Sequence, residues 1–250
     1  MIRSVADNGV VRLLIDRPER RNAIDRATSL ALGDALEKAQ RDPATRVIVI
    51  KGAGEVFSTG RDLKAAASAP QPSGPPDEDE AWVRLFHLLL RSPVVSVASV
   101  RGFAVAGGFT LAMGCDFVLA ERAAVFGAYE MRHGFPAAVC TPILARLAGP
   151  KLGLEFALLG EPIPAERLHA AGLVNRLADT PQALADVEEK FARQIAALDP
   201  QAVRQTRDMF RAAETMPLDN ALDMGRQLNQ LIGAGGGFVR AGRSLGGKKA

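Results

Sequence analysis

VVSVASVRGFAVAGGFTLAMGCD, residues 94–116, joins a valine-rich strand pattern to a glycine turn and a short apolar helix pattern. Residues 94–100 are typical of a buried strand, and apolar residues recur at helical spacing over residues 109–113. Gly107 and Gly108 stand where that helix would begin, so a ligand could approach bare backbone there. The first N–H groups of a helix have no internal partner, and the helix dipole favours negative charge beside them. The stretch predicts a site for a developing anion, although a plain strand-to-helix turn fits the same pattern.

The length and composition of the chain set limits on its class. A chain of 250 residues can bury one good core with an appended subdomain. Its hydrophobic content of 48% and charged content of 24% are near the averages of soluble globular proteins. The longest charge-free segment, between Arg101 and Asp116, is shorter than the about 20 apolar residues that span a bilayer. The first ten residues lack the apolar core of a signal peptide. We therefore expect a soluble, cytoplasmic protein without a membrane partner.

Charged, cysteine and histidine residues exclude several classes of site. The net charge of +3 comes from scattered basic residues, which does not indicate a nucleic-acid partner. Cys115 and Cys140 form neither a CxxC motif nor a disulfide framework, so we expect two buried free thiols. The three histidines have no metal-ligand spacing, and we expect no metal.

The first half of the chain predicts a parallel strand–helix–strand unit. Residues 10–15 and 46–51 are strand patterns, and residues 25–41 between them are a helix pattern with Asp25 as its N-cap. Such a unit is a right-handed crossover in a mostly parallel sheet. A second glycine turn follows at residues 57–64, FSTGRDLK.

The rest of the chain is mostly helical in pattern. Residues 65–80, rich in Pro, Ser and acid, predict a mobile loop, for which a lid and a merely disordered segment are both open. Further strands are expected at 117–120 and 125–127, and helices at 81–90, 142–147, 151–159, 165–171, 182–197, 202–213 and 218–232. A subdomain boundary is expected near residue 199, and a loosely held tail from residue 233.

The two glycine turns indicate backbone chemistry, because the common alternatives are missing from the sequence. There is no GxSxG elbow, no GxGxxG fingerprint and no P-loop pattern. Turns near Gly60 and Gly107 could converge on one oxygen, and Glu130 lies just after the expected strand 125–127. Two N–H donors and one carboxylate can hold and reprotonate an enolate.

Five motifs in order resemble the crotonase (enoyl-CoA hydratase/isomerase) superfamily over essentially the whole chain. They are RPERRNAI at 17–24, VFSTGRDLK at 56–64, VRGFAVAGGFTLAMGCDFVLA at 100–120, VFGAYEMRHGFP at 125–136 and AAGLVNRL at 170–177. The resemblance implies an α/β fold with a ββα spiral core over residues 1–198. It also implies a helical C-terminal subdomain over residues 199–250, for trimerisation or as a lid, and a homotrimer or dimer of trimers.

The resemblance also implies an active site for acyl-CoA thioesters. The backbone N–H groups of Arg61 and Gly107 would form an oxyanion hole for the thioester oxygen, and Glu130 would be the acid–base residue. The backbone of residues 59–64 resembles the segment that holds the adenine end of coenzyme A; the residues concerned are Thr59, Asp62, Leu63 and Lys64. Arg20 would lie near the nucleotide phosphates, with a solvated surface charge as an equal alternative. Coenzyme A belongs to the substrate, so no separate cofactor is implied.

Thr110 is where this chain departs from ordinary hydratases, which resemble it but have a second glutamate there. A threonine hydroxyl can position water but cannot act as a base near neutral pH. A single carboxylate suits a Δ3-Δ2 enoyl-CoA isomerase or a hydratase of relaxed design. A hydroxycinnamoyl-CoA hydratase-lyase, a third possibility, needs a phenol-binding group, for which Tyr129 is the only tyrosine. Residues 137–141 replace a glycine-rich stretch of many hydratases, which leaves the acyl group open.

Two further hypotheses follow from the same residues. A non-catalytic acyl-CoA-binding or RNA-binding member of the family would explain Thr110 but not the retained Glu130. His133 would lie on the face of Glu130 if residues 130–133 form a helical turn, and would then change the pKa of that carboxyl. A histidine with no catalytic role is the alternative.

Overall fold

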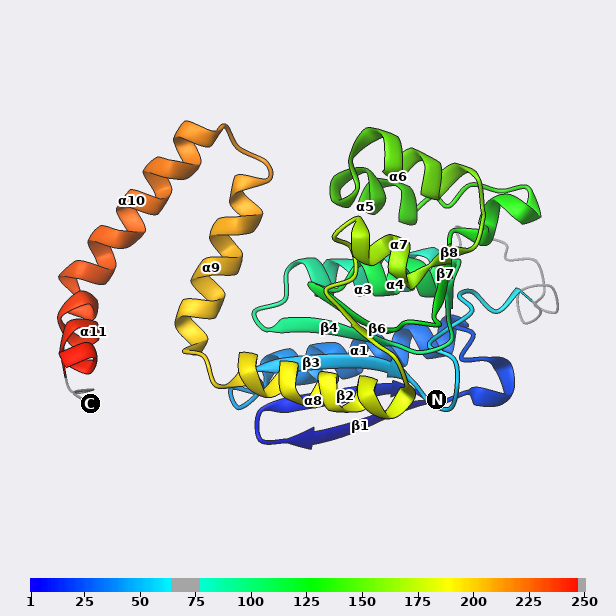
Figure 1. Cartoon of the computed structure of the whole chain (residues 1–250), viewed down its shortest axis with the longest axis horizontal. Coiled ribbons are helices and arrows are strands. Elements are labelled where there is room, and N and C mark those ends of the chain that lie inside the picture. Colours follow the sequence, from blue (N-terminus) through cyan, green and yellow to red (C-terminus); the bar gives the residue numbers. More distant parts are fainter. Residues whose placement is uncertain (64–76, 247–250) are drawn as a thin grey trace. The chain divides into compact units, whose positions relative to one another are not determined.

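The computed structural model describes the backbone of residues 1–63 and 77–246, in two compact units, Met1–Ala197 and Leu198–Ala250. The first unit contains a six-stranded sheet in the order β1-β2-β3-β4-β6-β9 (Figure 1). Its strands are β1 (Ile2–Asp7), β2 (Val10–Ile15), β3 (Val47–Gly52), β4 (Val95–Val100), β6 (Phe117–Glu121) and β9 (Arg176–Ala178). Only β1 is antiparallel to its neighbour; every other adjacent pair in this sheet is parallel.

A smaller sheet of three strands, β5 (Phe103–Val105), β7 (Val125–Gly127) and β8 (Ile163–Pro164), belongs to the same unit. The chain alternates between the two sheets, because β4 and β6 lie in the large sheet while β5 and β7 lie in the small one. Helix α4 (Gly107–Met113) follows β5 and returns the chain to β6. The repeated strand–strand–helix path is a ββα spiral, and it puts the start of α4 at the edge of the small sheet.

The helices of the first unit pack on the sheets and on one another. They are α1 (Arg26–Arg41), α3 (Asp77–Leu90), α4, α5 (Cys140–Leu147), α6 (Gly149–Leu158), α7 (Ala165–Ala170) and α8 (Pro181–Ala196). The 3-10 turn η1 (Pro18–Arg20) lies between β2 and α1, and η2 (Tyr129–His133) lies between β7 and α5. The core is aliphatic and aromatic, with Leu13, Ile48, Phe57 and Phe109 fully buried. Among the described residues no helix is long and apolar enough to cross a bilayer.

The expected crossover unit is confirmed, since β2 and β3 are parallel and α1 connects them. Asp25 caps α1 as predicted, and its carboxylate accepts a hydrogen bond from the Thr28 N–H at 2.8 Å. Both cysteines are buried free thiols, as expected. Strands β1, β5, β8 and β9 were not predicted. Strands β5, β8 and β9 have only two or three residues, and β1 is an exposed edge strand without an alternating apolar pattern.

The expected loop over residues 65–80 is wrong at its end. Residues 64–76 lie outside the described part, but residues 77–80 form the first turn of α3. Acidic residues in the first turn of a helix are favoured by its dipole, so Asp79 and Glu80 suit the start of this helix.

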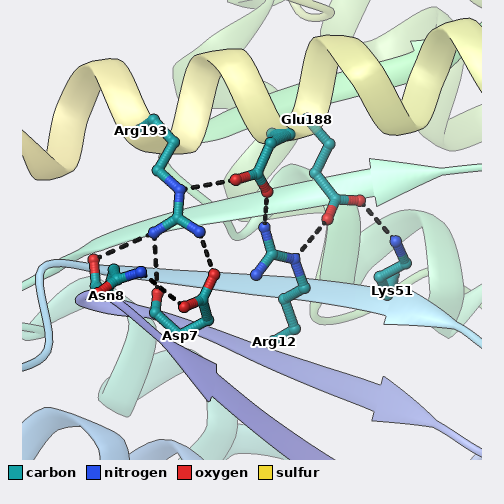
Figure 2. Close-up of polar contacts among 7 residues, drawn as sticks. Asp7, Asn8, Arg12, Lys51, Glu188 and Arg193 are labelled. Carbon is teal, nitrogen blue, oxygen red and sulfur yellow. Dashed lines mark hydrogen bonds and ion pairs between the residues drawn. The ribbon is translucent and has the colours of Figure 1, made fainter.

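An ion-pair cluster fixes α8 to the large sheet (Figure 2). Glu188 on α8 is 3% exposed and accepts from Arg12 on β2 at 3.0 Å and from Lys51 on β3 at 2.7 Å. The neighbouring Glu189 pairs with both Arg12 and Arg193. Glu188 therefore links two adjacent strands to the helix that packs on them.

Replacing Glu188 with glutamine should lower the free energy of unfolding by about 3 kcal/mol, because Lys51 would lose its Glu188 carboxylate and Arg12 would keep only that of the exposed Glu189. The matched control is Glu189→Gln on the same helix. Glu189 is 48% exposed, and we expect its loss to cost at most about 1 kcal/mol. Urea denaturation of both variants measures the difference, and equal midpoints would contradict this role for Glu188.

The second unit consists of α9 (Pro200–Ala213), α10 (Leu218–Ala234) and α11 (Gly237–Gly246). Asp199 caps α9 and accepts from the Ala202 N–H at 2.8 Å. Helix α11 was not predicted, since the sequence favoured a loosely held tail from residue 233. The ring of Phe238 packs over Gly233, so an apolar contact ties this last helix to α10.

Candidate active site

The turn around Gly60 is hydrogen-bonded along the strand that leads into α4. Ser58 donates its N–H to the Phe103 carbonyl at 3.0 Å, and its own carbonyl accepts from the Val105 N–H at 3.1 Å. On the other side of the turn, the Gly60 carbonyl accepts from the Ile24 N–H at 2.7 Å. These bonds bring the two glycine turns together, although they are far apart in the sequence.

The amide nitrogens of Arg61 and Gly107 lie close together. A methyl group built on Gly107 would lie 3.4 Å from the Arg61 nitrogen, and one built on Gly60 would lie 2.5 Å from the Gly107 nitrogen. The Gly107 nitrogen is two covalent bonds from the methyl carbon built on the same residue. The Arg61 and Gly107 nitrogens are therefore at most about 6 Å apart. Two N–H donors at that separation can reach a single oxygen, since each needs about 2.9 Å. Gly60 has a φ of +82°, which only glycine adopts readily.

A cavity of about 540 Å³ opens onto these amides. Its lining combines apolar and aromatic side chains with a few polar groups: Ile24, Asp25, Arg26, Ser29, Thr59, Arg61, Leu63, Asp79, Trp82, Val105, Ala106, Gly107, Thr110, Tyr129, Glu130, His133, Phe135, Pro136, Ala138, Val139 and Cys140. All of the lining belongs to the first unit. A mostly apolar cavity with few convergent polar groups is the usual form of a small-molecule site.

Glu130 is placed in this cavity by η2, which follows directly after β7. Its Oε2 atom is buried and has no hydrogen-bond partner within the described part of the chain. Burial raises the pKa of the Glu130 carboxyl above its ordinary value, against the opposing effects of a hydrogen bond from its own backbone and of His133. A carboxyl group with a raised pKa in a cavity is suited to exchange protons with a ligand.

The remaining carboxylates of the lining are engaged elsewhere. Asp25 caps α1 and pairs with Arg17 at 3.0 Å, whereas Asp79 is 59% exposed and pairs with the side chain of Arg61 at 3.2 Å. Among the described lining residues, Glu130 is therefore the one carboxylate with a buried oxygen that points to no protein partner.

Thr110 and Cys140 form a neutral part of the cavity wall beside Glu130. Thr110 is 2% exposed and Cys140 is 1% exposed. Burial raises the pKa of the Cys140 thiol to about 12, against a hydrogen bond with Thr110 and together with the nearby charge of Glu130. The Cys140 thiol is therefore protonated near neutral pH. Thr110, at the position where ordinary hydratases have a second glutamate, is uncharged.

The residues expected to hold coenzyme A are only partly gathered at the cavity. Thr59 and Leu63 line it, and Lys64 lies outside the described residues. Asp62 is 5% exposed and turns inward, where its carboxylate pairs with Arg17 and Arg20, each at 3.2 Å. The Arg20 side chain is 42% exposed at the edge of this ion-pair cluster.

The structure adds cavity residues that sequence reasoning missed. The Trp82 ring on α3 would lie 3.1 Å from a methyl group on Gly107, so it forms a wall beside the paired amides. Cys140 begins α5 and reaches the same cavity. Trp82 is the only tryptophan of the chain, which was a weak signal; Cys140 gave none. His133 lines the cavity with Glu130, as hypothesised.

Comparison with known proteins defines the class. The enoyl-CoA hydratase/isomerase family matches residues 5–234, and the chain belongs to this family, within the crotonase superfamily. The expected fold, a crotonase-like ββα spiral core with C-terminal helices, is confirmed by solved structures. An enoyl-CoA hydratase from Polaromonas sp. JS666 superposes with a TM-score of 0.87 at 29% identity, covering 98% of this chain and 96% of that one.

Two curated relatives show how far the chemistry varies among similar proteins. The 1,2-epoxyphenylacetyl-CoA isomerase of Escherichia coli K12 is 32% identical over 238 residues, 93% of this chain and 90% of its own length. A carnitinyl-CoA dehydratase of Salmonella paratyphi A is 34% identical over 214 residues, 84% of this chain and 80% of its own. The family acts on acyl-CoA thioesters, and these relatives include both isomerase and dehydratase types.

Proposed function

We propose that this protein is an acyl-CoA enzyme that forms a thioester enolate and moves protons with one carboxylate, Glu130. The backbone N–H groups of Arg61 and Gly107 hold the thioester oxygen as negative charge develops on it. Such donors stabilise the charged transition state more than the ground state, and in other enzymes losing one costs about 100- to 1,000-fold in kcat. The observation that supports this most is the pairing of the two amide nitrogens, at most about 6 Å apart, in the cavity of Glu130.

The reaction that the site favours is double-bond migration. Glu130 as the carboxylate removes a proton from the α-carbon of a 3-enoyl thioester, and the electrons move to the oxygen held by the two amides. The protonated Glu130 then returns the proton to the γ-carbon, which gives the 2-enoyl thioester. One carboxylate is enough for this cycle, and the neutral wall of Thr110 and Cys140 offers no second base.

Water addition to a 2-enoyl thioester is the second candidate, favoured by the hydroxyl of Thr110 on the same wall. In that reaction Glu130 would take a proton from water and deliver it to the α-carbon alone. Incubation with trans-3-enoyl-CoA and trans-2-enoyl-CoA of several chain lengths separates the two reactions. Conjugated-enoyl absorbance rises in the first case and falls in the second. Absence of turnover with every thioester would favour a non-catalytic binding protein.

His133 should influence the pH at which activity is lost on the acidic side of the pH–rate profile. Its positive charge lowers the pKa of the Glu130 carboxyl, so His133→Ala should raise that pKa further. Because Glu130 must lose its proton to act as a base, the acidic limb of kcat should move to higher pH in the variant. His87→Ala, on the exposed side of α3, is the control. Superimposable profiles for wild type and His133→Ala would end this role for His133.

Thr59 and Leu63 would contact the coenzyme A part of the substrate, with Arg20 near its phosphates. We also propose a homotrimer or a dimer of trimers in the cytoplasm. Exposed apolar residues of the second unit, such as Phe210, Leu222 and Leu231, support an assembly that covers them. Sedimentation equilibrium measures the assembly directly.

A further inference from the structure

The peptide that carries the Gly107 N–H group is held on its carbonyl side by Thr110. The carbonyl oxygen of Ala106 accepts from the Thr110 N–H at 3.1 Å, as the first hydrogen bond of α4. It also accepts from the Thr110 hydroxyl at 3.3 Å. One oxygen therefore receives two donors from a single residue one helical turn later.

The direction of that carbonyl sets the direction of the next N–H. The carbonyl of Ala106 and the N–H of Gly107 belong to one planar trans peptide, so they point in opposite directions. Because the carbonyl points along α4 toward Thr110, the N–H points away from the helix, to the side on which Gly60 and Arg61 lie. Rotation of this peptide would remove the donor from the cavity.

The backbone of Ala106 is strained, and rotation of the peptide that follows it would relieve this strain. Its φ of +50° and ψ of −126° are unfavourable for a residue with a side chain. Its own N–H donates to the Gly127 carbonyl at 2.8 Å, which fixes the preceding peptide. The following peptide, the one that carries the Gly107 N–H, depends on the two bonds from Thr110. A strained residue is kept in place only where its surroundings define its conformation.

We propose that Thr110 is a positioning residue that orients the Gly107 amide of the oxyanion hole. This inference rests on the proposed function and assigns the hydroxyl a role other than holding water. The single O–H proton of Thr110 is used by the Ala106 carbonyl, and burial of the side chain shields that bond from solvent. The hydroxyl then acts on every reaction that passes through the enolate, whether or not water takes part.

The test compares Thr110→Val, which keeps the shape but loses the hydroxyl, with Thr110→Ser, which keeps the hydroxyl. Thr141→Val is the matched control, because Thr141 donates both its N–H and its hydroxyl to the Ala137 carbonyl, each at 2.8 Å, outside the cavity lining. Two rates are measured for each protein. One is exchange of the α-protons of butyryl-CoA in D2O, followed by NMR, and the other is turnover of 2- and 3-enoyl-CoA.

Thr110→Val should lower both rates by the same factor, about tenfold, which is less than the loss of a whole oxyanion donor. KM should stay unchanged, Thr110→Ser should recover most of the rate, and Thr141→Val should match wild type. Should Thr110→Val fail to fold, Thr110→Ala against Thr110→Ser gives the same comparison.

Slower water addition with normal α-proton exchange would overturn the proposal, because the hydroxyl would then be acting on water. Rates in Thr110→Val equal to those of Thr141→Val would overturn it as well. A wild-type protein that neither exchanges α-protons nor turns over any thioester would instead remove the proposed function, and this inference with it.

Discussion

Glu130→Gln should lower turnover of enoyl-CoA by about 1,000-fold, the scale of a general acid–base group. The amide keeps the size and polarity of the side chain but cannot accept a proton from the α-carbon. Affinity for a saturated CoA thioester should change little, because the amides of Arg61 and Gly107 and the cavity wall remain. Stopped-flow turnover and isothermal titration calorimetry measure the two quantities separately.

The control for this variant is Glu166→Gln. Glu166 lies on α7, is 60% exposed and pairs with Arg122 at the surface, so its amide variant should keep wild-type turnover. Retention of more than about a tenth of the activity in Glu130→Gln would contradict an acid–base role, since such groups contribute about 100-fold or more.

Gly60→Ala should reduce kcat by about 100-fold or more, comparable to the loss of one oxyanion donor. The added methyl group would lie 2.5 Å from the Gly107 nitrogen and 2.9 Å from the Val105 carbonyl oxygen, so one of the two turns must move. The positive φ of Gly60 adds backbone strain at the same place.

Gly172→Ala is the control that distinguishes the effect of backbone strain from the effect of the steric contact in Gly60→Ala. Gly172 has a φ of +78°, close to that of Gly60, but a methyl group there would have nothing within 4 Å. The two variants should therefore lose similar stability from the backbone, and only Gly60→Ala should lose activity. Thermal denaturation and kcat are measured for both, and equal activity in the two variants would argue against the paired amides.

Much of the fold could be predicted because its signals are local. The strand patterns at residues 10–15 and 46–51, the cap at Asp25 and the glycine turn before α4 each depend on a few neighbouring residues. Asn22, in the RPERRNAI motif, is fully buried, and its amide donates to the carbonyls of Ala53 and Val56. Three-residue strands such as β5 and β7 carry too little pattern to show that they form a second sheet.

The rest depends on contacts between distant positions. Glu188 bonds to Lys51 across 137 positions of sequence, and no local pattern distinguishes it from the exposed Glu189. Trp82 and Cys140 reach the cavity from α3 and α5, whose starts the sequence placed a few residues too late. The proximity of the Arg61 and Gly107 nitrogens follows from the Ser58 bonds to the small sheet, which only the three-dimensional structure displays.

A crystal structure with a bound acyl-CoA thioester tests the central claim most directly. We expect a thioester oxygen about 2.7–3.1 Å from both the Arg61 and the Gly107 nitrogens, with the Glu130 carboxylate beside the α-carbon. A thioester bound in this cavity with its oxygen on neither nitrogen, or with Glu130 turned away from the acyl chain, would contradict it.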